Sequence, residues 1–454
     1  MKNEKNNSKS TGENITRRDF VGRSALALGA VTIVPRHVLG GNGFTPPSDK
    51  LNIACVGAGG KGVSDIRKVS TENLVAFCDV DDVEAAETYK AFPNVKRYKD
   101  FRIMLEEHDS DIDAVTVSTP DHTHAVVAMM AIKMGKHVFV QKPLTHTVKE
   151  ARMLAEAAKE EEVITQMGNQ GHAGEGARLV NEWIWDGAIG DVTEVHTWTN
   201  RPIWPQNIEK PEAIPSVPPT LDWNLWIGPA PWRHYHPEYA PFNWRGWWDF
   251  GTGVIGDMGA HIIDHPFWAL DLGYPETVQA TSTPFNDQSY PLASIITYTF
   301  PAKGEKPPVK LKWFDGGLLP PRPEELEPGR MMGEKGGGVI FIGTKGKLMC
   351  SVYGENPRII PETKMKEYKR PEKTIPRSPG IHEEWVAACK GEGETTSHFD
   401  YAAKLTEMML LGNIAIRLQD RKMIFEWDGP NMRFTNSEEA NQFLHKEYRE
   451  GWTL

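Results

Sequence analysis

The chain has 454 residues, enough for about two or three domains, and its 39% hydrophobic and 25% charged residues are typical of a globular protein. A formal net charge of −10 argues against a surface that binds nucleic acid or anionic membranes. Four scattered cysteines lack the spacing of a metal or redox motif, and they are Cys55, Cys78, Cys350 and Cys389.

The first part of the chain has the pattern of an export signal. Arg17 and Arg18 are followed by Phe20 and by a short apolar stretch over residues 24–34. That stretch is too short to span a bilayer as a helix, which needs about 20 residues. The pattern resembles a bacterial twin-arginine signal, and a disordered basic tail is the alternative. We therefore expect residues 1–45 to be signal and linker, and the protein to be exported to the periplasm.

A glycine-rich turn follows the apolar run 51–56. In a dinucleotide site, such a turn bends tightly, lets the backbone approach a pyrophosphate and packs the next helix against the strand. A second apolar run ends at Asp79, at the distance expected of an acid that binds the ribose hydroxyls. The strand–turn–helix setting favours dinucleotide binding over a purely structural turn. The candidate cofactor-binding residues of the turn are Gly57, Gly59, Gly60 and Gly62.

Strands and helices alternate over residues 50–166, which predicts a Rossmann dinucleotide-binding domain with a parallel sheet. Ligands of such sheets lie beyond the carboxyl ends of the strands. His122-x-His124 could be a metal pair, but on a loop before a helix it is better interpreted as structural or nucleotide-facing. Besides Asp79, the predicted edge carries the cofactor-binding candidates Thr119, Pro120, His124, Gln141 and Lys142.

Residues 200–245 contain ten prolines and little periodicity, and eleven of the 15 tryptophans lie between Trp183 and Trp268. Disordered segments are poor in aromatic residues, so this stretch predicts an ordered wall over the active site. Tryptophan faces suit the apolar faces of sugar rings. Core or subunit-interface packing is the alternative, and both can hold.

The stretch after this segment contains Asp257 and His261, which would face the same way on a helix at i and i+4. A carboxylate that orients a histidine for acid–base chemistry, a metal site that includes His265, and a buried structural histidine are three interpretations of this pattern. Further candidates for substrate binding are Asn169, His172, Arg245, Trp248 and His265.

Taken together, these motifs resemble the Gfo/Idh/MocA oxidoreductases, named for glucose–fructose oxidoreductase and inositol dehydrogenase. The resemblance rests on the glycine turn, Asp79, Thr119-Pro120, Lys142-Pro143 and Asp257-x-x-x-His261. It implies the catalytic set Lys142, Asp257 and His261. The family signature is Glu-Lys-Pro, and this chain departs from it with an amide at Gln141.

The resemblance also implies a fold class and a reaction. It predicts an α/β protein in which a Rossmann NAD-binding domain (50–166) precedes an α+β domain (167–454) for substrate binding and oligomerisation, with a large open, mainly antiparallel sheet. The expected function is oxidation of a secondary hydroxyl of a sugar or glycoside. The cofactor is expected to be NAD rather than NADP, because the Asp79 carboxylate would repel a 2′-phosphate.

Three other functions stay open. The first is a glycosidase that keeps NAD bound and works by oxidation, elimination, hydration and reduction. The second is a metal-dependent hydrolase, and the third is a non-catalytic nucleotide sensor. We expect no metal, no nucleic acid and no stable membrane insertion; the expected partners are a small sugar or glycoside and further copies of the chain, as a dimer or tetramer.

Overall fold

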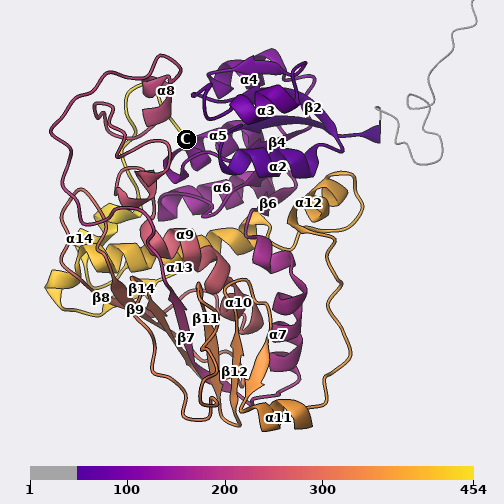
Figure 1. Ribbon diagram of the computed structural model, residues 1–454, viewed down its shortest axis with the longest axis vertical. Coiled ribbons are helices and arrows are strands. Elements are labelled where there is room, and N and C mark those ends of the chain that lie inside the picture. The colour runs from indigo at the N-terminus through magenta and orange to yellow at the C-terminus, as the bar shows by residue number, and fades with distance from the viewer. Residues whose placement is uncertain (1–48) are drawn as a thin grey trace, which may run out of the picture. The chain divides into compact units, whose positions relative to one another are not determined.

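The apolar runs of the N-terminal part form a six-stranded sheet in the computed structural model, which describes residues 49–454 (Figure 1). Its strand pairs are parallel, in the order β3-β2-β1-β4-β5-β6, which is the Rossmann order. The strands are β1 (Asn52–Val56), β2 (Asn73–Cys78), β3 (Lys96–Tyr98), β4 (Ala114–Val117), β5 (His137–Val140) and β6 (Thr165–Met167). The predicted export signal lies outside the described residues.

Strand β1 is apolar throughout because both of its faces are covered. Ala54 and Val56 belong to one buried cluster, whereas Ile53 and Cys55 belong to another that includes Ile66 of the next helix. This explains why the run does not alternate, as is usual in parallel sheets. The helices between the strands are α2 (Lys61–Val69), α3 (Ala86–Ala91), α4 (Phe101–Glu107), α5 (Asp121–Lys133) and α6 (Val148–Glu160).

Between β2 and α4, helix α3 begins only at Ala86, and the residues that precede it make turns. Strand β3 was not predicted at all. Its three residues include two exposed basic side chains, Lys96 and Arg97, so it lacks the apolar pattern by which buried strands are recognised.

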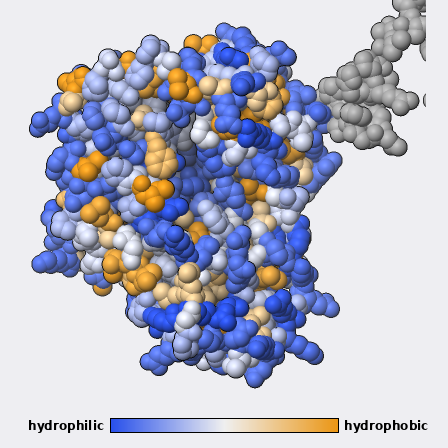
Figure 2. Space-filling model, in the orientation of Figure 1, coloured by the Kyte–Doolittle hydropathy of each residue, from blue (hydrophilic) through white to orange (hydrophobic). Residues whose placement is uncertain are grey.

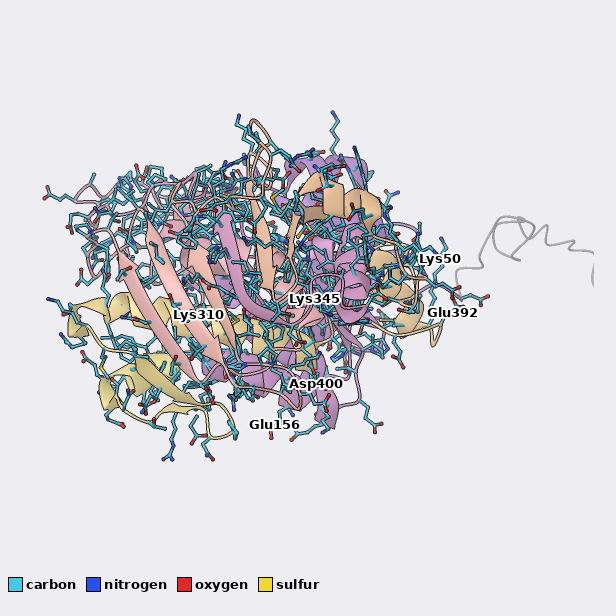
Figure 3. The ribbon with its side chains drawn as sticks, turned by 90° about the horizontal axis from the view of Figure 1, so that it is seen from below. Lys50, Glu156, Lys310, Lys345, Glu392 and Asp400 are labelled. Atoms are coloured by element: carbon cyan, nitrogen blue, oxygen red, sulfur yellow. The ribbon has the colours of Figure 1, made fainter. Side chains whose placement is uncertain are left out.

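A nine-stranded sheet forms the second part of the fold. Its order is β13-β12-β11-β7-β10-β9-β8-β14-β15, and β10 with β7 is the parallel pair among otherwise antiparallel ones, so the predicted fold class is confirmed. Figure 3 shows these strands side by side, with Lys310 of β10 labelled. The strands are β7 (Val192–Thr199), β8 (Thr277–Ser282), β9 (Ser294–Phe300), β10 (Val309–Phe314), β11 (Gly337–Gly343), β12 (Lys347–Cys350), β13 (Arg358–Ile360), β14 (Phe425–Asp428) and β15 (Arg433–Phe434).

Helix α13 (Phe399–Arg417) connects the two sheets. It packs against α6 of the Rossmann part and against β8 of the large sheet, and its side chains are almost all buried. The hydrophobic core is therefore continuous between the two parts. The other helices are α7 (Glu175–Trp185), α8 (Trp223–Ile227), α9 (Gly253–Ile262), α10 (Asp264–Ala269), α11 (Glu362–Glu367), α12 (Ile381–Cys389) and α14 (Glu438–Asn441), with 3₁₀ turns at Gln170–Ala173, Asn243–Gly246, Gln419–Arg421 and Gln442–Leu444.

The proline-rich segment is organised by its aromatic residues. Trp223 and Trp226 stack with ring centroids 4.7 Å apart, and both belong to a buried cluster with Tyr239, Trp247 and Phe250. Stacked and edge-on pairs of this kind add to the free energy of burying the rings. The segment is therefore ordered without regular secondary structure over most of its length.

The surface seen in Figure 2 is mostly hydrophilic, and hydrophobic residues on it occur in small groups. Among residues 49–454, no helix combines the length and the apolar character needed to cross a membrane.

Gly62 should tolerate no side chain, because a Cβ atom there would lie well inside contact distance of the Gly57 carbonyl oxygen, a backbone atom. We expect Gly62→Ala to lower the free energy of unfolding by about 1–3 kcal/mol, as overpacked sites do. Urea denaturation measures this. Ser64→Ala, at an exposed position of the same helix, is the control and should change stability by less than about 0.5 kcal/mol. Equal stabilities for the two variants would contradict the close approach of α2 to β1.

Candidate functional site

A cleft of about 580 Å³ runs along the carboxyl ends of the parallel strands. The proline-rich segment forms its opposite wall, with Trp226, Phe242 and Trp244, as the aromatic pattern predicted. Predicted site residues that line the cleft are Gly57, Gly59, Gly60, Asp79, Thr119, Pro120, Gln141, Lys142, Arg245, Asp257 and His261.

The glycine-rich turn fits a dinucleotide. A Cβ atom at Gly57 would lie 2.5 Å from the Ser118 carbonyl oxygen, so the turn can pass this close to β4 only without a side chain. Gly60 has φ +49° and open space around it, and it precedes the first residue of α2. The start of this helix lines the cleft at Gly60 and Lys61, and free amide groups with the positive end of a helix dipole are what a phosphate site requires.

Asp79 holds this turn in place. One oxygen of its carboxylate accepts hydrogen bonds from the backbone N–H groups of Ala58 (2.8 Å) and Gly59 (2.9 Å), and the other accepts one from Asp81 (2.9 Å). Burial raises the pKa of Asp79 above its ordinary value, although these hydrogen bonds oppose the shift. A carboxylate has about four lone-pair sites, so room remains for one ribose hydroxyl.

Lys142 and Asp257 form an ion pair across the end of the cleft. The Lys142 Nζ donates to Asp257 Oδ1 at 2.6 Å and to the Asp257 carbonyl oxygen at 2.9 Å, and each side chain is 16% exposed. The Arg245 guanidinium lies 3.6 Å from the same carboxylate oxygen. Burial would raise the pKa of Asp257, but the positive charges of Lys142 and Arg245 outweigh it and hold that pKa below its ordinary value.

His261 lies one turn beyond Asp257 on α9, as predicted, but the predicted contact between the two is absent. The hydrogen bonds of the Asp257 carboxylate within residues 49–454 go to Lys142, and His261 Nδ1 is buried with no partner there. The imidazole packs edge-on against Tyr353, with ring centroids 4.9 Å apart. Burial, and next the charge of Lys142, lower the pKa of His261 to about 3, so the ring is neutral at physiological pH.

Gln141 donates its amide N–H to Asp65 Oδ2 at 2.8 Å, a contact that the sequence did not predict. Asp65 is fully buried, and it also accepts from Ser118 (2.8 Å), Lys61 (2.6 Å) and His382 (3.0 Å). A glutamate at position 141 would set two carboxylates at hydrogen-bond distance, which accounts for the amide at this position of the family signature. The available signal was a carboxylate on the buried face of α2, which it shares with Gly62, Ile66 and Val69.

The predicted histidine pair is structural. Each ring nitrogen of His124 faces a carbonyl oxygen, of Pro143 or of Thr119, at 2.8 Å, and His122 lies between the carbonyl groups of Trp226 and Phe250. His124 does not line the cleft, and its two hydrogen bonds position the chain at Pro143 and Thr119. Within residues 49–454, no cluster of three His, Cys, Asp or Glu side chains could hold a metal ion.

Of the five candidates for substrate binding, the structure places Arg245 in the cleft. Trp248 stacks on Tyr290 with centroids 3.6 Å apart, outside the cleft lining. His172 pairs with Asp264 at 3.0 Å. His265 lies on α10, a separate short helix, and its Nε2 is 3.1 Å from the Val352 carbonyl oxygen. Asn169, His172 and His265 are buried, and the structure does not bring them or Trp248 into the lining of the cleft.

Sequence comparison identifies two family domains in the chain. Residues 51–169 match an oxidoreductase family domain described as an NAD-binding Rossmann fold, and residues 187–301 match the C-terminal alpha/beta domain of the same family. A levoglucosan dehydrogenase of Pseudarthrobacter phenanthrenivorans is 26% identical over 185 residues, which is 40% of this chain and 38% of that protein. A glycosyl hydrolase family 109 protein of Shewanella sp. (strain ANA-3) is 27% identical over 124 residues, 25% of this chain and 27% of that protein.

These matches span well under two thirds of the relatives' own length. Among solved structures, a dehydrogenase of Bordetella pertussis in complex with NADH and UDP-GlcNAcA superposes with a TM-score of 0.57 at 17% identity. The superposition covers 84% of this chain and 99% of that one. At this identity it establishes the shared fold alone.

Gln141→Glu should make folding sensitive to pH. The new carboxyl would face Asp65 in a buried site, so its folded-state pKa would rise above its unfolded value of about 4.3. A carboxyl group with a raised pKa in the folded state costs no folding free energy at low pH, where it is protonated in both states. As pH rises, the free energy of unfolding falls, by about 1.4 kcal/mol for each unit by which the folded-state pKa exceeds the unfolded one. We expect the variant to lose more stability at pH 8 than at pH 5 in urea denaturation.

The matched control is the double variant Asp65→Asn with Gln141→Glu, which exchanges the amide and the carboxylate between the same two positions. It should recover most of the loss at pH 8. A single variant whose stability relative to the unaltered protein is the same at both pH values would contradict the contact.

Proposed function

The chain belongs to the Gfo/Idh/MocA oxidoreductase family, and on this premise we propose that it oxidises a secondary hydroxyl of a sugar or glycoside with NAD. The observation that carries the proposal is the group formed by Lys142, Asp257 and His261 at one end of the dinucleotide cleft. It combines a fixed cation, its counter-ion and a neutral histidine around a space open to a small molecule.

The proposed chemistry divides between Lys142 and His261. When bound, NAD supplies the hydride acceptor for the carbon that carries the hydroxyl. Lys142, held by Asp257, binds the hydroxyl oxygen and stabilises the negative charge that develops on it. His261 is neutral and so has a nitrogen free to accept the hydroxyl proton. Asp257 acts through Lys142 rather than through the histidine.

The wall opposite the strand ends supports a carbohydrate substrate. Phe242 and Trp244 line it, and the Arg245 guanidinium lies 4.2 Å from the Trp244 ring centroid and 4.6 Å from that of Phe242. Aromatic faces bind the apolar faces of sugar rings, while a guanidinium donates to several hydroxyls. The wall therefore offers both kinds of contact that a sugar needs.

A glycosidase that returns the hydride to the sugar after cleavage is the second candidate. The similarity to a glycosyl hydrolase family 109 protein favours it, and it would use the same three residues. The two candidates differ in net chemistry. The dehydrogenase converts NAD to NADH in proportion to substrate, whereas the glycosidase releases the aglycone with no net NADH.

We also propose that the protein is exported through its twin-arginine pattern, and that it assembles as a homo-oligomer. Arg17 and Arg18 with the following apolar stretch support export. The family resemblance supports assembly through the large sheet.

His261→Ala should lower turnover about 10²–10⁴-fold, as losses of a general base do, with NAD affinity little changed. That range corresponds to about 3–5 kcal/mol of barrier. Single-turnover oxidation over a panel of glycosides, beside nucleotide titration, measures both quantities. In the unaltered enzyme His261 is neutral throughout about pH 5–8, so its protonation should cause no fall in turnover over this range.

His196→Ala is the control, since His196 is a buried histidine of β7 outside the cleft lining. It should leave turnover within about twofold of the unaltered enzyme. Near-normal turnover in His261→Ala would remove the histidine from the mechanism.

Asp79→Ala should reduce the ratio of the affinity for NAD to the affinity for NADP. In the unaltered protein the carboxylate would accept a hydrogen bond from the adenosine ribose and repel a 2′-phosphate, and the substitution removes both the hydrogen bond and the repulsion. Affinity for both nucleotides should fall because the amide groups of Ala58 and Gly59 lose their acceptor. Titration with NADH and NADPH measures the ratio, and Asp82→Ala, an exposed carboxylate nearby, should leave it unchanged. Tighter binding of NADPH by the unaltered protein would refute the role of Asp79.

A further inference from the structure

Two segments from distant parts of the chain line one end of the dinucleotide cleft. The apolar lining residues of this end are Val80, Phe101, Leu221, Leu225, Trp226 and Trp452, and the charged residues Asp81, Glu84, Lys99 and Asp100 line the cleft as well. Three of these come from residues 218–229 and one from residues 446–454, and we call these two segments the cover. In a Rossmann site, the half of the cleft beyond the ribose-binding acid receives the adenine base.

The first segment of the cover is fastened to the loop after β2. The backbone N–H of Asp222 donates to the Val80 carbonyl oxygen at 2.9 Å, and that of Asp82 donates to the Thr220 carbonyl oxygen at 3.2 Å. The Lys99 Nζ donates to the same Thr220 oxygen at 3.0 Å. These hydrogen bonds hold residues 218–229 against the loop that follows β2 and against Lys99.

The second segment is fastened to the first. The Arg449 guanidinium donates to the Asn224 side-chain oxygen at 2.7 Å and to the Gly228 carbonyl oxygen at 3.0 Å, and its backbone N–H donates to the Pro229 carbonyl oxygen at 3.1 Å. Towards the Rossmann part, Tyr448 donates to Glu150 at 2.7 Å. The second segment is thus held to both the first segment and helix α6.

Trp452 stands where the cover meets the cleft. Its indole packs against Phe101, with ring centroids 6.1 Å apart, and the Arg102 guanidinium lies 4.5 Å from its centroid. The same indole and Phe101 also border a second cavity of about 430 Å³ between α5 and α6, so Trp452 separates the two spaces. A large planar side chain held at the edge of the dinucleotide cleft is suited to stack on a base.

We propose that Trp452 contacts the adenine base of the bound dinucleotide, and that the cover slows its release so that it stays in the cleft through successive turnovers. The adenine contact stands on the dinucleotide site alone, whereas retention through turnovers rests on the proposed function. The structure therefore assigns to residues 446–454 a direct part in cofactor binding, although they lie outside both matched family domains.

The test uses the full chain loaded with NADH, whose release is followed by its fluorescence after addition of excess NAD. Trp452→Ala should release NADH about 10-fold faster, because stacking of one base on one aromatic ring contributes roughly that factor. Trp452→Phe keeps an aromatic face and should stay near the unaltered rate. Arg449→Ala, which removes the side-chain hydrogen bonds between the two segments without changing the cleft lining, should also speed release.

A second probe separates an adenine contact from general loosening of the site. Reduced nicotinamide mononucleotide lacks the adenosine half, so its affinity should be the same in Trp452→Ala and in the unaltered protein. Trp185→Ala is the control, since this tryptophan of α7 is half-exposed and outside the cleft, and it should not alter NADH release.

Unchanged NADH release in Trp452→Ala, or an equal loss of affinity for the mononucleotide, would overturn the adenine contact. Unchanged release in Arg449→Ala would overturn retention by the cover. A protein that holds NADH as described but oxidises no sugar would refute the proposed function and leave the adenine contact standing.

Discussion

The ion pair between Lys142 and Asp257 is the contact on which the site depends, because it joins the two parts of the fold. Lys142 follows β5 of the parallel sheet, and Asp257 belongs to α9, 115 residues later. The pair is mostly shielded from water, so its attraction is stronger than at a surface, and removing either partner would leave a charge uncompensated. Because His261 lies on the same helix one turn on, the pair also sets the position of the histidine relative to the nicotinamide end of the cleft.

One cation thereby serves two purposes. The Lys142 ammonium attracts the negative charge of Asp257 and, with burial, disfavours a positive charge on His261. Within residues 49–454 the neutral histidine donates no hydrogen bond to a carboxylate, which is the opposite of the arrangement expected from the Asp-x-x-x-His spacing. A carboxylate hydrogen-bonded to the imidazole would favour its charged form, but in this site the Asp257 carboxylate pairs with Lys142 instead.

The parts of the site that follow from local rules were predictable. The glycine turn, Asp79 and the i, i+4 pair of Asp257 and His261 each depend on one strand end or one helix. The prediction that Asp257 contacts His261 failed because it depends on tertiary structure. The spacing places both residues on one helix face, but it cannot show that Lys142, from another part of the chain, pairs with Asp257. The same limit hid the contact between Gln141 and Asp65, and the strand β3, which is held by its neighbour β2 rather than by apolar residues of its own.

The cover also has a consequence for biosynthesis, because its second segment is made long after the sheet it closes. Translation completes β6 at Met167 and reaches Lys446 only 279 residues later (446 − 167). At about 5–20 residues per second, the ribosome needs on the order of 15–60 s for this stretch. During that interval the six Rossmann strands have been made while the segment that carries Trp452 has not, so a dinucleotide that binds then meets a site without this part of its lining.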